Sequence, residues 1–347
     1  MQLLSLRERL RAHGALPSHE ARVLRLWSCG LPQSAGRRRP EDFLPATLRA
    51  ALPAIEADLD RLARLRSAHA ADDGAASRLL VELADGQAVE AVLLPRGGLC
   101  VSSQVGCAVG CTFCMTGRDG LVRQLGSAEI VAQVALARRL RAVRKVVFMG
   151  MGEPAHNLDA VLEAIDLLGT AGGVGHKDIV LSTVGDWRVL DALGTPRAVR
   201  PALAFSLHAT DPALRARLLP RAPRLDLEAF VAAADAYARA TGYPLQVQWT
   251  LLAGVNDGLD QVDGLVRLLG GRRAILNLIP YNRVAGFAWE RPSFEATERL
   301  AQALHRRGVR TTVRRSAAQD VDGGCGQLRA REARPRAAPI AIRPAAG

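Results

Sequence analysis

The residues best suited to chemistry in this chain are cysteines. Cys107, Cys111 and Cys114 follow a C-x3-C-x2-C spacing, and Cys100 lies a few residues upstream. Thiolates are soft ligands that bind zinc or iron–sulfur clusters. A loop this short cannot bury each thiol separately, so we predict that they converge on one metal centre. Structural zinc would take all four thiolates, whereas three thiolates on a four-iron cluster would leave one iron open to a small molecule.

The two remaining cysteines have different surroundings. Cys29 is isolated near the N-terminus, and we interpret it as a small buried residue. Cys325 lies in the glycine-rich stretch D-V-D-G-G-C-G-Q-L near the C-terminus. A structural cysteine normally occupies an apolar run, so we predict that Cys325 is exposed and reactive.

Alternating strand and helix patterns must position these groups. Short apolar runs at 146–150, 179–182, 202–208, 246–252, 275–279 and 309–314 alternate with helical periodicity at 127–141, 157–168, 227–239, 259–269 and 293–307. Alternation of this kind indicates a parallel sheet, and about six repeats indicate a barrel or partial barrel with its chemistry at the C-terminal strand ends. The runs are followed by G-M-G-E-P, S-T-V-G, S-L-H-A and P-Y-N. We expect these polar segments to share one ligand.

The chain ahead of the barrel divides into two patterns. Helical periodicity at 21–27 and 45–65 predicts a small helical accessory domain. Two strand patterns, 78–83 and 88–94, are joined through Asp85-Gly86 and predict a hairpin that leads into Cys100, with Glu90 on its second strand. From Arg329 the sequence is rich in Arg, Ala and Pro without periodicity, which predicts disorder. We therefore divide the chain into 1–75, 76–328 and 329–347.

Composition limits the class of protein and its partners. The 347 residues are 49% hydrophobic, enough for a large core, and carry a net charge of +12 in which Lys145 and Lys177 are the only lysines. Arginine matches phosphate oxygens, so the charge favours a nucleic-acid partner, although an arginine-rich genome could produce the same bias. The chain lacks a run of about 18 apolar residues and an N-terminal apolar signal. We therefore expect a cytoplasmic protein without a membrane partner, and not a disulfide scaffold.

The motifs between residues 85 and 328 closely resemble the RlmN/Cfr family of radical S-adenosylmethionine (SAM) adenosine methyltransferases. The similar segments, in order, are V-E-A-V-L-L-P, L-C-V-S-S-Q-V-G-C-A-V-G-C-T-F-C, M-G-M-G-E-P, L-S-T-V-G, F-S-L-H-A-T, L-L-A-G-V-N-D, L-I-P-Y-N and D-V-D-G-G-C-G-Q-L. The resemblance implies an α/β fold, a partial (β/α)6 radical SAM barrel entered through a β-hairpin. The N-terminal segment and the stretch after Leu219 depart from the family pattern, so we expect RNA contacts there to differ.

The same resemblance implies roles for individual residues. Cys107, Cys111 and Cys114 would hold a [4Fe-4S] cluster. Cys325 would be the cysteine that becomes S-methylated, Cys100 its resolving partner and Glu90 the proton acceptor. The residues at SAM-binding positions are Gly152, Glu153, Ser182, Ser206, Leu207, His208 and Asn282.

The implied reaction is radical methylation of a ring carbon of adenosine in 23S rRNA, with tRNA as a further candidate. C2 is favoured over C8, and both remain open. By this resemblance the methyl group passes through Cys325, and a transient disulfide with Cys100 releases the product. The electron would come from a donor such as flavodoxin or ferredoxin. Two alternatives remain: a radical SAM enzyme with another substrate, and a non-catalytic zinc protein that binds RNA.

Overall fold

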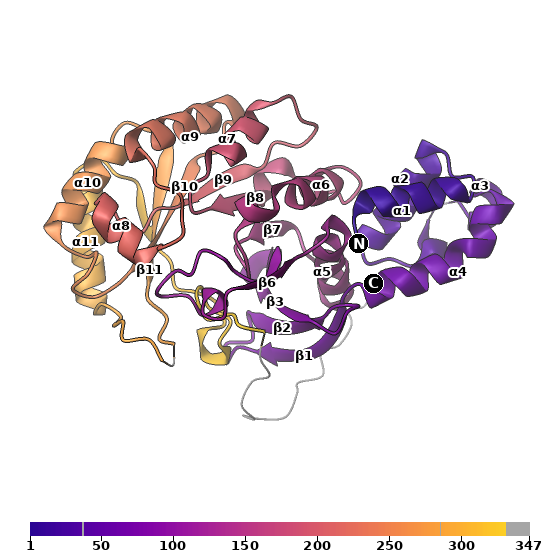
Figure 1. The fold of residues 1–347 in the computed structure, drawn as a ribbon, viewed down its shortest axis with the longest axis horizontal. Coiled ribbons are helices and arrows are strands. Elements are labelled where there is room, and N and C mark those ends of the chain that lie inside the picture. The colour runs from indigo at the N-terminus through magenta and orange to yellow at the C-terminus, as the bar shows by residue number, and fades with distance from the viewer. Residues whose placement is uncertain (37, 285, 331–347) are drawn as a thin grey trace.

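The protein is built around a curved sheet of ten strands. The structure is a computed structural model that describes residues 1–36, 38–284 and 286–330. Residues 331–347, most of the tail for which we expect disorder, lie outside the described residues. The strand order in the sheet is β1-β2-β3-β4-β7-β8-β9-β10-β11-β12, which is also their order along the chain. Every strand therefore pairs with its predecessor in this series, and the sheet curves progressively around one interior (Figure 1).

The parallel part of the sheet confirms the predicted partial radical SAM barrel. Its strands are β4 (Gly98–Cys100), β7 (Lys145–Phe148), β8 (Ile179–Thr183), β9 (Ala202–Ser206), β10 (Leu245–Leu251), β11 (Ala274–Pro280) and β12 (Thr311–Val313). The helices between them are α5 (Ser127–Leu140), α6 (Leu158–Gly169), α7 (Trp187–Gly194), α8 (Pro212–Leu218), α9 (Leu227–Thr241), α10 (Leu259–Leu269) and α11 (Phe294–Arg306). Except for α8, which lies near the strand ends where Arg215 contacts Val184, these helices cover the outer face of the sheet (Figure 1).

The antiparallel part contains the predicted hairpin and one strand that we did not predict. β2 (Ser77–Glu82) and β3 (Ala88–Leu94) form the hairpin, and β3 pairs antiparallel with β4. β1 (Arg64–Ala70) adds to the outer edge of β2. The hairpin thus leads directly into the strand that ends at Cys100.

A second, two-stranded sheet frames the cysteine loop. β5 (Gln104–Gly106) pairs antiparallel with β6 (Leu121–Gln124), and the loop with the three spaced cysteines runs between them. Short 3-10 helices complete the described elements: η1 (Gln33–Ala35), η2 (Pro95–Gly97), η3 (Met115–Gly117), η4 (Pro154–Asn157), η5 (His176–Asp178) and η6 (Gln319–Val321).

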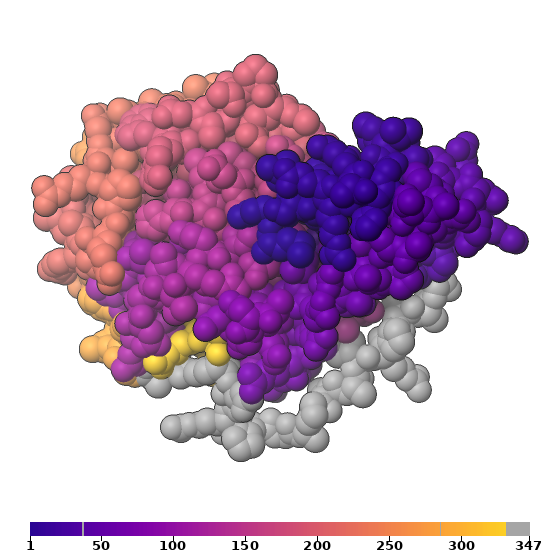
Figure 2. All heavy atoms as spheres, turned by 45° about the vertical axis from the view of Figure 1, so that its right-hand side comes forward, coloured from indigo at the N-terminus to yellow at the C-terminus, as the bar shows by residue number. Residues whose placement is uncertain are grey.

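The N-terminal helices form a lobe that projects from one side of the barrel (Figures 1 and 2). They are α1 (Leu3–Ala12), α2 (Pro17–Ser28), α3 (Pro40–Phe43) and α4 (Ala46–Arg61). The lobe docks on α5, where Arg138 donates to the carbonyl of Ser28 at 2.9 Å. Cys29 lies next to this contact and is half-buried. None of the helices in the described ranges combines the length and apolarity needed to cross a bilayer.

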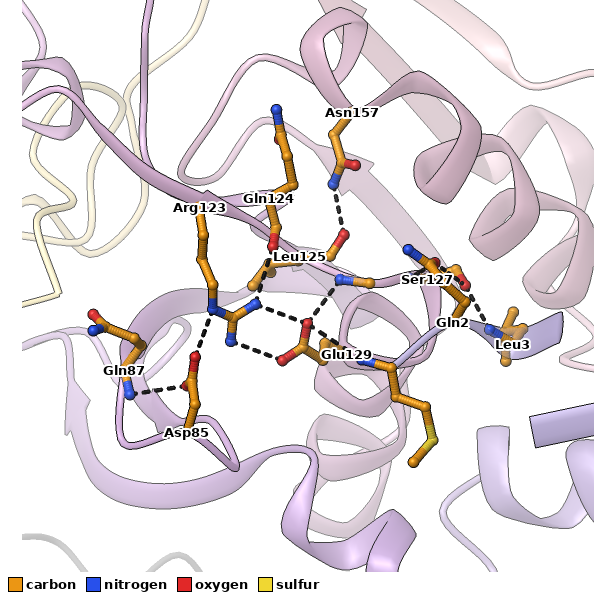
Figure 3. A network of polar contacts seen from close by, with 12 residues as sticks. Gln2, Leu3, Asp85, Gln87, Arg123, Gln124, Leu125, Ser127, Glu129 and Asn157 are labelled. Atoms are coloured by element: carbon orange, nitrogen blue, oxygen red, sulfur yellow. Dashed lines mark hydrogen bonds and ion pairs between the residues drawn. The ribbon is translucent and has the colours of Figure 1, made fainter. Parts of the chain in front are cut away.

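A polar network ties the hairpin turn, β6 and the N-terminus to the start of α5 (Figure 3). Arg123 of β6 donates to Asp85 in the turn at 2.6 Å and to Glu129 of α5 at 2.8 Å. The backbone N–H of Leu3 donates to Ser127 Oγ at 2.7 Å. Both carboxylates raise the pKa of the Arg123 guanidinium, Glu129 more strongly, so this arginine stays charged. The base of the cysteine loop is therefore anchored from two directions.

Candidate active site

Four of the polar segments predicted to share a ligand do meet at one edge of the sheet. Gly152 and Glu153 follow β7, Ser182 lies near the end of β8, Ser206 ends β9 and Asn282 follows β11. The C-terminal ends of parallel strands lie at the same edge, which is where α/β proteins bind their ligands. The hydroxyl oxygens of Ser182 and Ser206 are 3.5 Å apart.

The cysteine loop lies against this edge. The N–H of Cys107 donates to the carbonyl of Gly120 at 2.9 Å, and the N–H of Cys114 donates to the carbonyl of Cys111 at 3.0 Å, which fixes both ends of the loop. The ring of Phe113 meets the ring of His208, which follows β9, edge-on with 4.9 Å between centroids. The three spaced thiols are thereby held beside the polar strand ends.

The loop thiols form one electrostatic group. Burial raises the pKa of the Cys107 thiol to about 12, with the neighbouring Cys114 adding to the shift. Burial also raises the pKa of Cys111 and of Cys114, and Cys111 is affected by both other thiols. Three soft donors close enough to affect one another's pKa fit an iron–sulfur cluster, which would displace their protons. Among the described residues, no three His, Cys, Asp or Glu side chains are arranged to hold a single metal ion.

Cys100 stands apart from that group and next to Cys325. It is buried at the end of β4, and burial followed by the neighbouring Cys325 raises the pKa of its thiol above the usual range. Cys325 itself is exposed, as predicted. Its carbonyl accepts from Asn282 Nδ2 at 2.9 Å, and the next carbonyl, of Gly326, accepts from the N–H of Met115 at 2.7 Å. The C-terminal loop thus places Cys325 near both Cys100 and Cys114 of the cysteine loop.

Glu90 contacts the C-terminal loop from β3. Its side chain is only 1% exposed and pairs with Arg78 of β2, which is equally buried. Arg78 Nε also donates to the carbonyl of Val321 at 2.6 Å, and Glu90 Oε2 accepts from the backbone N–H of Arg329 at 2.7 Å. Figure 1 shows this yellow C-terminal segment beside β1 and β2. We did not predict Arg78, although an arginine at the start of an apolar strand run was a detectable signal.

Glu153 is buried, and backbone donors hold its carboxylate. Its two carboxylate oxygens accept from the N–H groups of Ala155 at 3.1 Å and Val184 at 3.0 Å. Burial raises the pKa of Glu153 to about 7 despite these bonds. The preceding Gly152 has a φ of +108°, and a Cβ there would lie 2.7 Å from Gln104. Only glycine therefore allows the backbone to approach β5 so closely.

His208 adopts a strained conformation that points to a functional position. Its φ is +61°, which is uncommon outside glycine. His208 Nδ1 accepts from the N–H of Thr250 at 2.9 Å, which places the proton on Nε2. Burial, with a contribution from Arg215, lowers the pKa of His208 to about 3, so the ring is neutral. Its Nε2–H is the donor that remains for a ligand.

Leu207 is the predicted site residue with the fewest groups free to bind a ligand. Its side chain is fully buried in the core. Its N–H donates to the carbonyl of Gln248 at 3.1 Å, and its own carbonyl accepts from the N–H of Ala209 at 2.9 Å. Any contact from Leu207 to a ligand would have to use the second lone pair of that carbonyl.

Arg215 is a second site residue that we did not predict. It is buried, donates to the carbonyl of Val184, and lies over the Phe205 ring with 5.7 Å from its guanidinium carbon to the ring centroid. Burial lowers the pKa of Arg215 to about 10, while Cys111 and Glu153 act in the opposite direction. The segment P-A-L-R-A-R-L resembles an ordinary surface helix, so the sequence carried no signal for this role.

Several known proteins that are similar to this chain are described as radical SAM proteins or RNA methyltransferases. Residues 101–269 match the model of the radical SAM superfamily. A probable RNA methyltransferase of Leptothrix cholodnii is 65% identical over 100% of this chain and 99% of its own length. Another, of Methylibium petroleiphilum, is 69% identical over 95% of this chain and 93% of its own length. The crystal structure of a radical SAM methyltransferase from Sphaerobacter thermophilus is similar, with a TM-score of 0.81, 35% identity, and coverage of 95% of this chain and 98% of that chain.

Proposed function

Because this chain belongs to the RlmN/Cfr-type family of radical SAM RNA methyltransferases, we propose that it methylates a ring carbon of an adenosine in 23S rRNA. We propose C2 as the methylated carbon, C8 as the alternative position and tRNA as a second candidate substrate. The observation that carries the proposal is that the exposed thiol of Cys325 lies next to the buried thiol of Cys100. The loop that carries Cys325 also contacts Glu90 through the backbone of Arg329.

A ring carbon of adenine is a poor nucleophile, so its methylation requires radical chemistry. In this proposal Cys107, Cys111 and Cys114 hold the [4Fe-4S] cluster, which is supported by the mutual effect of the three thiols on their pKa values. When the cluster is present, the chemistry available is one-electron reductive cleavage of SAM to a 5′-deoxyadenosyl radical, with the electron supplied by a flavodoxin or ferredoxin. The residues proposed to bind SAM are Gly152, Glu153, Ser182, Ser206, Leu207, His208 and Asn282.

Cys325 carries the methyl group. Its thiolate attacks the SAM methyl, an S–CH3 bond forms, and S-adenosylhomocysteine leaves. The side chain is exposed, while its backbone carbonyl is fixed by Asn282 and that of Gly326 by Met115. A fixed backbone with an accessible sulfur suits a carrier that must accept carbon from one molecule and present it to another.

Cys100 releases the product. By then the methyl carbon has lost a hydrogen atom to the 5′-deoxyadenosyl radical and has bonded to the ring carbon, and the adduct has given up the ring proton and one electron, which returns to the oxidised cluster. The Cys100 thiolate attacks the sulfur of Cys325, an S–S bond forms, the S–C bond breaks, and the carbon keeps the electron pair and takes up a proton to become the methyl group of the base. Burial raises the pKa of Cys100, so its thiol stays protonated, and therefore weakly nucleophilic, during the methylation of Cys325. A thiol held in reserve in this way would not compete with Cys325 for the methyl group.

Glu90 accepts the proton that leaves the ring carbon. It is a buried carboxylate, and a base must come within hydrogen-bond reach of the proton it removes. Glu90 Oε2 is occupied by the N–H of Arg329 in this structure. The adenine must therefore displace the backbone N–H of Arg329 from Glu90. Because Glu90 is buried, the target base must also leave its stack in the RNA to reach it.

The two parts of the chain divide the work in this proposal. Residues 76–328 form the catalytic unit, and residues 1–75 form an accessory domain that contacts RNA. The projection of the helical lobe to one side of the barrel supports this division, because RNA on the barrel edge could extend over it (Figure 2).

Mass spectrometry of digested rRNA and tRNA tests the proposal. RNA from cells that carry the gene should contain 2-methyladenosine that is absent from a deletion strain, and 8-methyladenosine would select the alternative position. Complementation with Cys325→Ala should leave the RNA unmodified, while Cys29→Ala should restore the modification. Identical RNA in the wild-type and deletion strains would contradict the proposal.

A further inference from the structure

The side-chain amide of Gln248 is buried inside the barrel without a partner. Gln248 lies on β10 and is 4% exposed. Neither its Oε1 nor its Nε2 has a hydrogen-bond partner among the residues that the structure describes. A buried donor and acceptor left unsatisfied are costly and rare in folded proteins. Such a group needs an explanation, and a ligand that supplies both partners would provide one.

The strand register shows which way Gln248 faces. Gln248 is opposite Ser206 of β9 and Asn277 of β11, and residues opposite one another in a sheet share a face. The other face carries Phe205, whose ring lies 4.8 Å from Phe230 of α9, on the helical side. Gln248 therefore points to the interior of the barrel, on the face of the serine proposed to bind SAM.

The polar side chains next to Gln248 on that face each have a partner within the protein. Asn277 Oδ1 accepts from Thr312 Oγ1 at 2.7 Å. The hydroxyls of Ser206 and Ser182 are 3.5 Å from each other. The backbone of Gln248 is also used, since its carbonyl accepts from the N–H of Leu207. Among the described residues on this part of the face, Gln248 is the one whose side-chain donor and acceptor both lack a partner.

We propose that Gln248 binds the adenosine part of SAM. This inference rests on the proposed function, because it takes SAM as the ligand of the barrel edge. A ligand that satisfies both atoms of the amide must itself donate and accept. The ribose hydroxyls and the amino edge of adenine do so, whereas the SAM carboxylate only accepts and the SAM ammonium only donates. The methionine part could pair both atoms only by bringing its ammonium and its carboxylate to Gln248 together, and Glu153, the carboxylate suited to the ammonium, follows β7, three strands away from β10 in the sheet.

Binding of S-adenosylhomocysteine to cluster-loaded protein, measured by calorimetry, tests this role. Gln248→Leu should weaken binding at least tenfold, because the polar groups of the ligand would face an apolar side chain. Gln246→Leu is the matched control: Gln246 is two residues earlier on the same strand and the same face, and is half-buried. The control should bind within twofold of the wild type.

Thermal melting separates a binding role from a structural one. In the absence of ligand, Gln248→Leu should melt no lower than the wild type, because it removes an unsatisfied buried group. A merely structural glutamine would instead lower the melting temperature when replaced. Loss of ligand affinity with undiminished stability is the result we expect.

Fragments of the ligand locate the contact. The difference between the wild type and Gln248→Leu should persist with 5′-deoxyadenosine and vanish with methionine. Equal S-adenosylhomocysteine affinity in the two proteins, or a loss seen only with methionine, would overturn the assignment of Gln248 alone. Failure of the wild type to bind S-adenosylhomocysteine would instead contradict the proposed function.

Discussion

Arg78 and Glu90 form an ion pair in which each side chain is only 1% exposed. Arg78 lies on β2 and Glu90 on β3, and Arg78 Nε also donates to the carbonyl of Val321 in the C-terminal loop. One guanidinium thus joins the proposed proton acceptor to the loop that carries the proposed methyl carrier. Because both charges have lost their hydration, each depends on the other.

Removing one member of this pair should be more harmful than removing both. Arg78→Met should lower the free energy of unfolding by about 3–5 kcal/mol, since Glu90 would remain buried and unpaired. The double variant Arg78→Met/Glu90→Met should recover most of that loss. Arg64→Met, on the exposed edge strand β1, should stay within about 0.5 kcal/mol of the wild type. Urea unfolding measures all four proteins, and equal effects at Arg78 and Arg64 would disprove the dependence.

The juxtaposition of Cys100 and Cys325 predicts where the reaction stops in each variant. Cys100→Ala should accumulate a covalent protein–RNA adduct, because nothing remains to attack the sulfur of Cys325. Cys325→Ala should form no adduct, and Cys29→Ala should behave as the wild type. Denaturing gels with labelled RNA report the adduct. Free methylated RNA from Cys100→Ala in single-turnover amounts would show that another group resolves it.

Glu153 and His208 should impose opposite pH dependences on the stability of the cluster-free protein. The native pKa of Glu153 is raised to about 7, so the native state holds more protons than the unfolded state between the ordinary value of 4.5 and 7. Its contribution to stability is therefore lost as pH rises through that window. The native pKa of His208 is lowered from 6.5 to about 3, so its contribution is lost as pH falls through that range. The two effects oppose each other where the windows overlap.

Single variants should reveal the pH dependence of stability that each of the two groups contributes. In Glu153→Gln the melting temperature should rise with pH, relative to the wild type, between about 4.5 and 7. In His208→Asn it should fall with pH, relative to the wild type, between about 3 and 6.5. Melting curves across this range measure both differences. Parallel profiles for all three proteins would show that neither group titrates as its burial indicates.

The barrel was predictable because buried parallel strands appear as short apolar runs between amphipathic helices. Two other elements differ in how far the sequence could have revealed them. Helix α1 buries Leu3, Leu6 and Leu10 at helical spacing, a signal that was present and that we did not use. Strand β1, with the sequence R-L-R-S-A-H-A, has no apolar face and becomes a strand only because β2 offers it hydrogen bonds. Pairing of this kind depends on the tertiary structure.

The site also has a part that the sequence predicts and a part that depends on the tertiary structure. Polar residues after successive strands predicted a shared edge, and the structure brings them there. The pairing of Arg78 with Glu90 was not predictable, because it depends on the register of the hairpin. A three-residue loop, 84–86, sets Arg78 opposite Val92 and Leu80 opposite Glu90, so the two charges are diagonal neighbours on one face. A turn one residue shorter would have shifted every pair, and the Asp85-Gly86 dipeptide fits both.

Gly326, next to Cys325, allows a test of whether the C-terminal loop must sit where it does. Its φ is +86°, and a Cβ there would lie 2.9 Å from the carbonyl oxygen of Phe113 in the cysteine loop. Gly308, after α11, has a φ of +82° and no atom within 4 Å of the same position. Alanine at either site carries the same left-handed strain, roughly 1–2 kcal/mol, but only alanine at Gly326 pushes the two loops apart.

Gly326→Ala should therefore slow S-methylation of Cys325 by SAM at least tenfold, while Gly308→Ala should methylate at the wild-type rate. Gly308→Ala controls for the left-handed strain that both variants share, and Gly326→Ala should lose more stability because of its added contact with the backbone of Phe113. Peptide mass spectrometry of Cys325 over time, together with melting curves, gives both quantities. If the two variants methylate at the same rate, contact between the C-terminal loop and the cysteine loop does not set the position of the carrier sulfur, and Cys325 must reach SAM by a movement that tolerates the displaced backbone.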